Sequence, residues 1–333
     1  MPVTLDTLKD FETKLYTVND SRFEDIALEL FHFQAVHNPV YRNYISNLRI
    51  DIGSIKQIGQ IPFLPIRFFK SHDIKTGEWL PEVTFTSSGT TSSGNSRHAV
   101  RDLQFYLRHS QRCFEHFFGS ITEFHLLVLL PSYLEREGSS LIAMIDHFIK
   151  QTGSDYSNFY LYDLEKLVQQ LTLLKLDTRR TLLWGVSFAL MDLAETHVVD
   201  LSHCLIFETG GMKGRRKEIV RSELHKYLKN SFHIEKVFSE YGMTELLSQA
   251  YSTGEGRFFC PPWMKVTSRE ITDPFQIGLL NETGGINVID LANWHSVAFI
   301  ETEDLGRVFE DGSFEVLGRA DNSDVRGCNL LVE

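Results

Sequence analysis

Short apolar runs alternate with longer amphipathic stretches through the middle of this 333-residue chain, and this alternation most constrains its fold. Strands are expected at the apolar runs 124–130, 159–162, 181–186, 203–207 and 234–238. The stretches between them have helical spacing of apolar residues, and helices are expected at 139–151, 163–175, 187–197 and 216–229. Strands that alternate with helices of about a dozen residues indicate an α/β fold with a largely parallel sheet.

The regions before and after this alternating segment have different sequence patterns. Residues 5–49 are expected to form helices, because apolar side chains recur there at helical spacing. A short strand at 83–86 is expected to run into a polar loop, followed by a helix at about 99–118. After Tyr251, short β runs separated by turns predominate. We therefore predict an α/β core at 1–251, a β-rich subdomain of the same domain at 252–317, and a hinge-like tail at 318–333.

Charge and composition exclude several classes of protein. The chain has 33 basic and 44 acidic residues, a net charge of −11, which argues against nonspecific binding to nucleic acid. No apolar run approaches the roughly 18–20 residues that span a bilayer, and the N-terminus lacks a signal-peptide core. The cysteines have no CxxC spacing. We expect a cytoplasmic protein with reduced thiols and no membrane span.

The stretch Phe85–His98 is composed almost entirely of Gly, Ser, Thr and Asn. Such residues build no core, but they offer backbone N–H groups and hydroxyls to an anion, and Gly89 and Gly94 permit positive φ. A flexible linker has the same composition. Taken alone, the stretch is compatible with either a linker or a phosphate-binding loop.

A second polar segment follows the strand that ends near Phe207, where Glu208-Thr-Gly-Gly leads into a helix. In open α/β sheets, ligands bind just beyond the carboxyl ends of the strands. Gly210 and Gly211 would let a flat ring lie against the backbone. The alternative is a plain turn from strand to helix.

A third segment, Ser239-Glu-Tyr-Gly-Met-Thr-Glu245, follows the next strand, and a helix is expected to begin near Thr244. Tyr241 can stack on a base, Thr244 can donate to a phosphate, and Glu245 can hold Mg²⁺ with a hard oxygen ligand. The alternative is an ordinary helix cap formed by Thr244.

A fourth pair of segments places Asp304 and Arg319 near strand ends, where they could hold two ribose hydroxyls. Each segment taken singly is equally compatible with a β-turn. The chain has neither a P-loop nor a GxGxxG motif, which excludes a P-loop NTPase or a Rossmann dehydrogenase by motif.

The order of these segments resembles the adenylate-forming superfamily of acyl- and aryl-CoA synthetases and luciferases. Thr86–Gly94 looks like its phosphate loop, Tyr241–Glu245 matches its Tyr-Gly-x-Thr-Glu motif, and Thr302-Glu-Asp304 looks like its Thr-Gly-Asp motif. Gly318-Arg-Ala-Asp321 is similar to its hinge motif. The resemblance implies the N-terminal domain of an adenylate-forming enzyme, with layered α/β sheets, a β-rich subdomain, and a C-terminal domain absent or truncated.

Within this superfamily the chain most resembles the LuxE-type acyl-protein synthetases. Ile61–Lys70, Glu208–Gly214 and the terminal Arg326-Gly-Cys-Asn329 carry that resemblance. It implies ATP-dependent activation of a fatty acid, or another carboxylic acid, to acyl-AMP. The acyl group would then pass to a cysteine thiol, and an acyl-protein reductase partner is implied.

The resemblance also implies roles for individual residues, with ATP and Mg²⁺ as cofactors. The β- and γ-phosphates would be bound by Thr86, Ser87, Ser88, Gly89, Thr90 and Thr91, the adenine by Gly210, Gly211 and Tyr241, the α-phosphate by Thr244, Mg²⁺ by Glu245, and the ribose by Asp304 and Arg319. The usual Pro-Lys after the loop glycines is absent, and Arg97 or His98 is expected to supply the positive charge. Thr90, Thr244 and Cys328 are the expected catalytic residues.

Cys328 is the candidate acyl acceptor, because Arg326 beside it would lower the pKa of its thiol. The alternative is a small apolar residue in the tail. Cys204 lies in an apolar strand and is expected in the core. Two other functions stay open: a CoA ligase for another acid, and a scaffold that keeps the nucleotide fold without turnover.

Overall fold

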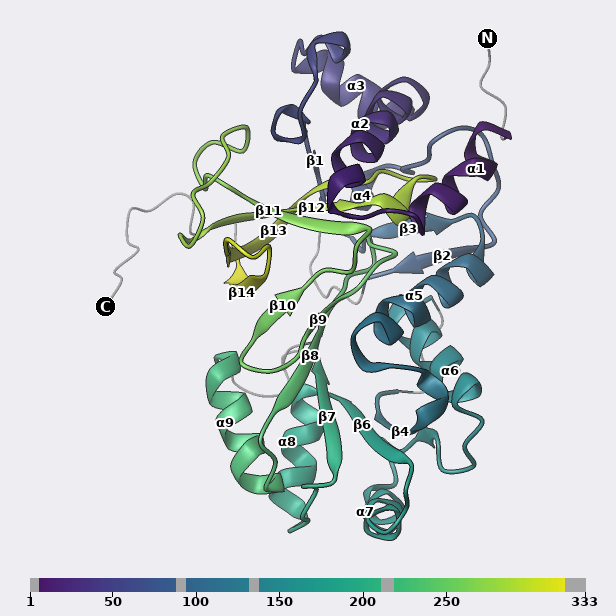
Figure 1. Cartoon of the computed structure of the whole chain (residues 1–333), viewed down its shortest axis with the longest axis vertical. Coiled ribbons are helices and arrows are strands. Elements are labelled where there is room, and N and C mark those ends of the chain that lie inside the picture. The colour runs from purple at the N-terminus through teal and green to yellow at the C-terminus, as the bar shows by residue number, and fades with distance from the viewer. Residues whose placement is uncertain (1–5, 88–93, 132–137, 211–218, 321–333) are drawn as a thin grey trace. The chain divides into compact units, whose positions relative to one another are not determined.

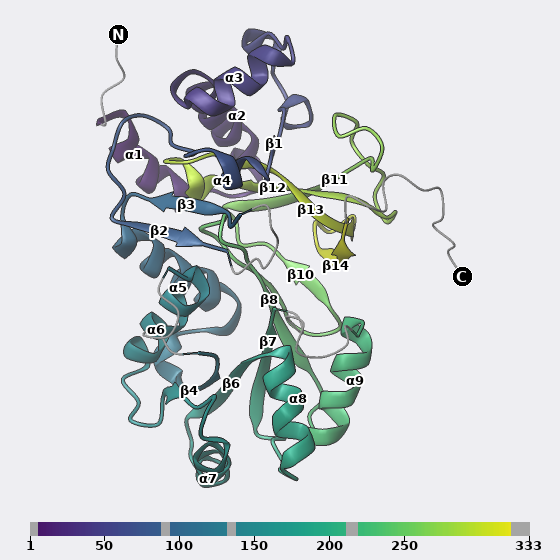
Figure 2. The same ribbon diagram turned by 180° about the vertical axis from the view of Figure 1, so that it is seen from behind.

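The computed structural model describes residues 6–87, 94–131, 138–210 and 219–320 (Figure 1, and from behind in Figure 2). Contacts divide the chain into two compact units. The central unit is Trp79–Pro261, and the terminal unit combines Met1–Glu78 with Pro262–Glu333. Helices and strands mix in both units, so the predicted α/β class is confirmed. The division predicted at 251 and 317 stays a prediction.

The sheet of the central unit runs in the order β10-β9-β8-β7-β6-β4-β5. Strands β5, β4, β6, β7 and β8 are parallel neighbours, and β9 and β10 add antiparallel strands. Their bounds are β4 Phe124–Leu129, β5 Asn158–Phe159, β6 Arg180–Val186, β7 Cys204–Thr209, β8 Val237–Tyr241, β9 Ala250–Ser252 and β10 Arg257–Phe259. The largely parallel sheet predicted from the apolar runs is confirmed. Every residue of β4 is buried, as expected for a strand covered on both faces.

Helices cover both faces of this sheet (Figures 1 and 2). Helix α8 packs on β6 and β7 and α9 on β8, whereas α5 packs on β9 and α6 on β4. Their bounds are α5 Leu103–Phe118, α6 Ser140–Thr152, α7 Leu164–Leu174, α8 Ser187–Thr196 and α9 Arg221–Phe232. Asp102, Ser139 and Asp163 cap helices with side-chain oxygens that accept backbone N–H groups.

The polar loop lies inside a hairpin, which differs from the prediction. Strands β2, Val83–Thr86, and β3, Arg97–Val100, pair antiparallel, and α5 begins only at Leu103. The prediction had a helix directly after the loop. The alternation of buried His98 and Val100 with less buried neighbours is a strand pattern that the sequence-based interpretation assigned to a helix.

The terminal unit combines N-terminal helices with C-terminal strands. Its helices are α1 Asp6–Leu15, α2 Asp20–His37, α3 Pro39–Asn47 and α4 Phe68–Ser71. Its strands are β1 Leu64–Pro65, β11 Met264–Arg269, β12 Gly284–Asp290, β13 Phe299–Val308 and β14 Phe314–Arg319. Strands β11 to β14 pair antiparallel, and β1 pairs parallel with β13. The helices predicted within 5–49 and the β texture predicted after Tyr251 are confirmed.

A buried glutamine joins helix and strands in the terminal unit. The Gln34 amide of α2 donates to the carbonyl of Asn293 at 3.0 Å, and its oxygen accepts from the Ala298 N–H at 3.0 Å. A buried amide is stable only when its donors and acceptor are satisfied, so these bonds fix α2 against the chain that precedes β13.

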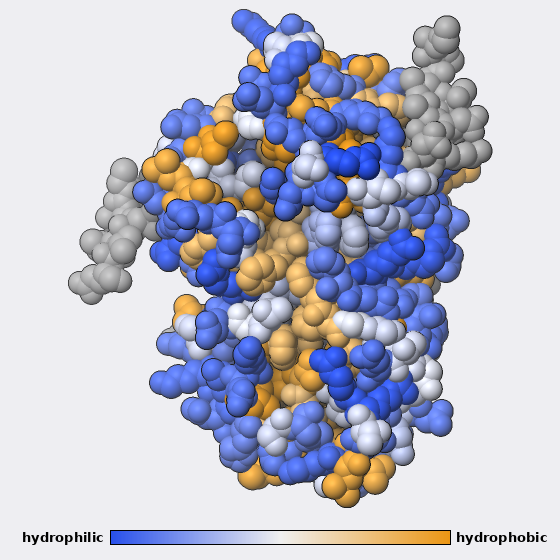
Figure 3. Space-filling model, in the orientation of Figure 1, coloured by the Kyte–Doolittle hydropathy of each residue, from blue (hydrophilic) through white to orange (hydrophobic). Residues whose placement is uncertain are grey.

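Most residues visible in Figure 3 are hydrophilic, and hydrophobic residues also gather on this face. No helix among the described residues is long and apolar enough to cross a membrane.

Candidate active site

The carboxyl ends of β7 and β8 present polar side chains on both faces of the central sheet. Successive side chains of a strand point to opposite faces. Glu208 and Ser239 contact α9 residues on one face, which we call the α9 face. Thr209 and Glu240 contact each other on the opposite face, which we call the α5 face.

On the α9 face, Glu208 accepts hydrogen bonds from several neighbours although it is only 3% exposed. The partners are Ser239 Oγ at 2.8 Å, Arg221 Nε at 3.0 Å and Ser187 Oγ at 3.2 Å, with His225 Nε2 at 3.5 Å. Burial by itself raises the pKa of this carboxyl, but the hydrogen bond from His225 and the charge of Arg221 outweigh it and lower the pKa. Glu208 is therefore a buried carboxylate with its partners supplied by α8, β8 and α9.

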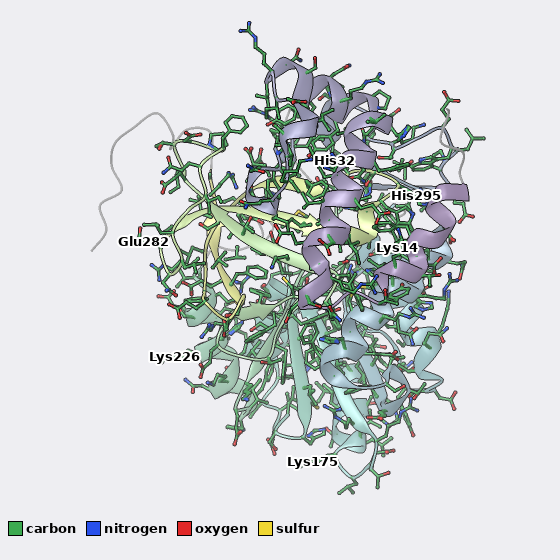
Figure 4. The ribbon with its side chains drawn as sticks, turned by 45° about the horizontal axis from the view of Figure 1, so that its top comes forward. Lys14, His32, Lys175, Lys226, Glu282 and His295 are labelled. Atoms are coloured by element: carbon green, nitrogen blue, oxygen red, sulfur yellow. The ribbon has the colours of Figure 1, made fainter. Side chains whose placement is uncertain are left out.

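The side chains of helix α9 point in two directions, some toward Glu208 and others toward solvent. Lys226 points away from the sheet into solvent (Figure 4), whereas Arg221 and His225 on the same helix reach Glu208. The spacing of Arg221 and His225 places both on one side of the helix.

The predicted adenine-binding turn begins on this face. Gly210 has φ of +69°, a left-handed conformation that favours glycine, and its carbonyl accepts from Ser187 Oγ at 2.6 Å. Tyr241 is buried, with its ring 5.8 Å from that of Phe258. The Arg221 guanidinium lies 5.0 Å from the same Phe258 ring. The structure thus brings Gly210 and Tyr241 to the ends of neighbouring strands.

On the α5 face, only one carboxyl oxygen of Glu240 accepts a hydrogen bond from a described residue. Its Oε2 accepts from Thr209 Oγ1 at 2.7 Å, and no described residue donates to Oε1. A methyl group at Gly242 would lie 2.1 Å from Oε1, so the glycine keeps that oxygen uncovered. Burial, and then the negative charge of Glu208, raise the pKa of Glu240 to about 7.

Tyr251 lies directly across from Glu240 in the β8–β9 ladder. Its side chain is fully buried, and its hydroxyl has no hydrogen-bond partner among the described residues. Burial, and secondarily the charge of Glu240, raises the pKa of both Tyr251 and Tyr106 of α5. An unpartnered buried hydroxyl is uncommon in native proteins.

A hydrogen bond joins the predicted phosphate loop to the Tyr241–Glu245 segment. His98 Nδ1 lies 2.8 Å from the Thr244 carbonyl oxygen, and His98 is paired in the hairpin with Phe85. Burial lowers the pKa of His98 to about 4, so the ring is neutral at pH 7 and Nδ1–H donates. The expectation that His98 supplies a positive charge is therefore wrong.

The end of the hairpin is also fixed by backbone bonds. Ser87 N donates to Ser96 O at 3.0 Å, and Ser87 Oγ accepts from Ser96 N at 2.9 Å. Thr86 N donates to Gly138 O at 2.7 Å. The hydroxyl predicted to bind phosphate at Ser87 is therefore engaged in closing the hairpin.

Thr244 and Glu245 lie in a turn rather than at the start of a helix, which corrects the prediction. The described backbone from 242 to 249 is non-helical, with a turn bond from Leu246 N to Met243 O at 3.1 Å. The Thr244 carbonyl, which a helix would use for its own ladder, accepts from His98 instead. Glu245 is buried, and no group of three metal-binding side chains gathers in the described parts of the chain.

Asp304 and Arg319 form an ion pair in the terminal unit. They are directly paired residues of β13 and β14, with Arg319 Nε 3.3 Å from Asp304 Oδ1. Asp304 N donates to Thr302 Oγ1 at 3.1 Å, which orients the motif. The structure brings together the two residues predicted to hold the ribose.

Several predicted site residues lie outside the described residues: Ser88, Gly89, Thr90, Thr91, Gly211 and Cys328. Cys204 is buried in β7, and burial raises the pKa of its thiol to about 12, which agrees with the expected core role. The sequence-based interpretation assigned no role to Glu240, Tyr251 or Arg221. The sequence did contain a signal for Glu240. It is a charged residue two positions after the apolar Phe238 in the predicted strand, so it lies on the same face of the strand as Phe238.

No protein-family model matches the chain, and no curated protein matches it. Solved structures do share its fold. ATP-bound MatB from Rhodopseudomonas palustris aligns at 16% identity with a TM-score of 0.53, over 73% of this chain and 49% of that one. O-succinylbenzoate coenzyme A synthetase (MenE) from Bacillus subtilis, in complex with AMP, aligns at 17% identity and TM-score 0.51, over 72% and 49%.

The luciferase-like enzyme of the mealworm Zophobas morio aligns at 19% identity and TM-score 0.50, over 82% of this chain and 62% of that one. The chain spans about half the length of the MatB and MenE structures. The chain therefore shares the fold of part of these structures, which confirms the predicted α/β fold class.

Proposed function

We propose that this protein activates a carboxylic acid with ATP, producing an acyl adenylate and pyrophosphate. The observation that carries the proposal is the 2.8 Å bond between His98 and Thr244, which joins the base of the Ser/Thr/Gly loop to the Tyr-Gly-Met-Thr-Glu segment. The two segments are far apart in sequence and carry the predicted phosphate and base contacts. The likeness of the fold to an ATP-bound structure supports the same reading.

In this reaction a carboxylate oxygen attacks the α-phosphorus, a new P–O bond forms, and the bond to the β-phosphate oxygen breaks to release pyrophosphate. Negative charge increases on the phosphorus oxygens during attack. Donors fixed before the reaction stabilise that charge, and one such donor is typically worth about 3 kcal/mol. Thr244 is the described residue proposed to donate there.

Mg²⁺ is proposed to bind through Glu245 and phosphate oxygens of ATP. A single buried carboxylate fits this ion, which is usually held by one or two carboxylates with substrate phosphates and water. When bound, the ion neutralises charge on the departing pyrophosphate. In the central unit, Tyr241 and Gly210 are proposed to contact the adenine. Asp304 and Arg319 of the terminal unit keep the ribose role that their motifs predict.

The test is pyrophosphate release by the full chain with ATP, Mg²⁺ and a panel of carboxylic acids. Acid-dependent release is expected, and Glu245→Gln should lower kcat/KM at least about tenfold. Glu223→Gln, an exposed carboxylate on α9, is the matched control and should leave the rate unchanged. No release with any acid supports the scaffold alternative and overturns the proposal.

The finer proposal is transfer of a long-chain fatty acyl group to the thiol of Cys328. The thiolate would attack the acyl carbon of the adenylate, forming a thioester and releasing AMP. Intact-mass analysis after incubation with ATP, Mg²⁺ and the acid should show one acyl adduct that is lost in Cys328→Ser. Cys260→Ala is the control and should keep the adduct. An adduct that survives in Cys328→Ser contradicts this step.

A CoA ligase is the second candidate, favoured by the likeness of the fold to a coenzyme A synthetase. It predicts acyl-CoA formation on addition of CoA, with no covalent adduct on the protein. The same mass measurement, repeated with CoA present, separates the two candidates.

A further inference from the structure

At the carboxyl ends of β7 and β8, the two faces of the sheet differ in how many hydrogen-bond donors their glutamate has. On the α9 face, Glu208 accepts from Ser239 and Arg221, and Tyr241 packs beside Phe258. On the α5 face, Glu240 Oε1 accepts from no described residue. Both faces lie at the carboxyl ends of strands, where ligands of α/β sheets bind.

Strand geometry assigns the faces to different ligands. Tyr241 and Glu240 are consecutive residues of β8, so their side chains point to opposite faces. A base that stacks on Tyr241 lies on the α9 face and is separated from Glu240 by the sheet. The groups of the α5 face are then available to the second substrate, which is the acid.

We infer that Glu240, Thr209 and Tyr251 form a polar subsite for a hydrogen-bond donor on the acid, a hydroxyl or amino group in addition to its carboxyl. The inference rests on the proposed function. It names a substrate class within that function: acids that carry such a donor, a hydroxy- or amino-substituted fatty acid included, rather than unsubstituted alkyl acids.

The geometry of Glu240 supports a ligand contact rather than a structural role. Thr209 fixes one oxygen at 2.7 Å, and the absence of a side chain at Gly242 keeps the other open. The side chain is partly exposed, unlike that of Glu208. A carboxyl that served only the fold would be expected to accept from several donors, as Glu208 does from Ser239 and Arg221.

Tyr251 supplies the second, independent observation. Its hydroxyl is fully buried and unpartnered among the described residues, and Tyr251 is the cross-strand partner of Glu240. A buried hydroxyl without a partner carries a desolvation penalty that a ligand hydroxyl or amine can remove. Tyr106 does not compete for this role, since its hydroxyl donates to Ser140 O at 3.0 Å.

Aromatic side chains fill the core below this subsite. Trp184 stacks on Phe207 at 4.8 Å, and Phe114 lies 6.0 Å from Tyr251. These side chains are fully buried and pack around the ring of Tyr251. This packing fixes the ring, so the Tyr251 hydroxyl has a defined position for the donor on the acid.

The test compares matched pairs of acids that have the same carbon skeleton with and without a hydroxyl or amino group. Pyrophosphate release by the wild-type full chain should favour the substituted acid by roughly 10- to 100-fold in kcat/KM, because the unsubstituted acid leaves polar groups unpaired. Glu240→Gln should reduce that preference at least about tenfold, and Tyr251→Phe should reduce it less. The KM for ATP should not change.

Glu235→Gln is the matched control, since Glu235 is an exposed carboxylate just before the same strand. An equal loss of rate for both acids of a pair in Glu240→Gln, or a higher KM for ATP, overturns the inference. Equal rates for both acids in the wild type also overturn it.

Direct binding of the same acids, measured by calorimetry without ATP, separates this inference from the proposed function. Preference for the substituted acid that is lost in Glu240→Gln supports the subsite even if no pyrophosphate is released. Equal binding of both acids refutes the subsite even if the protein is an active ligase.

Discussion

The two faces of the β7–β8 strand ends carry one glutamate each, and the two carboxyl groups differ in their hydrogen-bond donors and in the direction of their pKa shift. Glu208 is surrounded by donors from α8, β8 and α9, and its pKa is lowered. Glu240 has one donor, Thr209, and its pKa is raised to about 7. The difference teaches that a buried carboxylate is stabilised by its partners rather than by its location.

The largest effect is expected from Glu208→Ala, because it removes the acceptor shared by Ser187, Ser239 and Arg221. Breaking a buried ion pair typically costs about 3–5 kcal/mol of unfolding free energy. Urea denaturation measures the loss. Glu223→Ala on the exposed side of α9 should change stability by less than about 0.5 kcal/mol. A loss below about 1 kcal/mol for Glu208→Ala would mean that this carboxylate is not a structural centre.

Gly242→Ala should destabilise the protein by about 1 kcal/mol, because the new methyl group would lie 2.1 Å from Glu240 Oε1 and the flexible carboxyl would have to move. The double variant Gly242→Ala, Glu240→Ala should recover most of this loss, since it removes the clashing carboxyl. Denaturant titration of both single variants and the double variant gives the interaction free energy. If the losses of unfolding free energy in the two single variants simply add in the double variant, the glycine is needed for the backbone conformation at 242 and not to make room for Glu240.

The pH dependence of stability should differ between wild type and Glu240→Gln. Glu240 binds its proton more tightly in the folded state, with a pKa of about 7 against an ordinary 4.5, so its contribution to stability falls as pH rises through that interval. Glu208, Thr209, Tyr106 and Tyr251 are the groups that face it.

Relative to wild type, Glu240→Gln should therefore gain stability between pH 5 and pH 8. We expect a gain on the order of 1 kcal/mol, because partial exposure screens the full effect. Thermal unfolding of both proteins across this range measures it, with Glu235→Gln as control. Parallel curves for wild type and Glu240→Gln would refute the raised pKa.

Thr209→Val should have the smallest effect, about 1 kcal/mol, because it removes one hydrogen bond to Glu240 while keeping the shape of the side chain. Ser239→Ala, which removes a bond to the fully buried Glu208, should cost more. Chemical denaturation of the two variants shows which carboxyl group loses more stability when one of its donors is removed. The reverse order would show that Glu240 depends on its single donor more than Glu208 depends on any one of its partners.

Local sequence patterns determined much of this protein. The apolar runs at 124–130, 181–186 and 203–207 predicted the parallel strands β4, β6 and β7. A strand that is buried on both faces is almost entirely apolar, so it can be recognised from its own residues alone. Motif order also identified the polar strand ends. The structure pairs Asp304 with Arg319 across β13 and β14, and their role at the ribose stays a prediction.

Only the tertiary structure decided the rest, because those features depend on partners distant in sequence. The helix expected at Thr244 is a turn, since His98, 146 residues earlier, takes the carbonyl that a helix would use. The charge expected on His98 is absent, because burial disfavours the protonated ring. Glu208 and Glu240 look alike in sequence, and they differ because strand alternation sends one toward α9 and its donors and the other toward α5, beside the unpartnered hydroxyl of Tyr251.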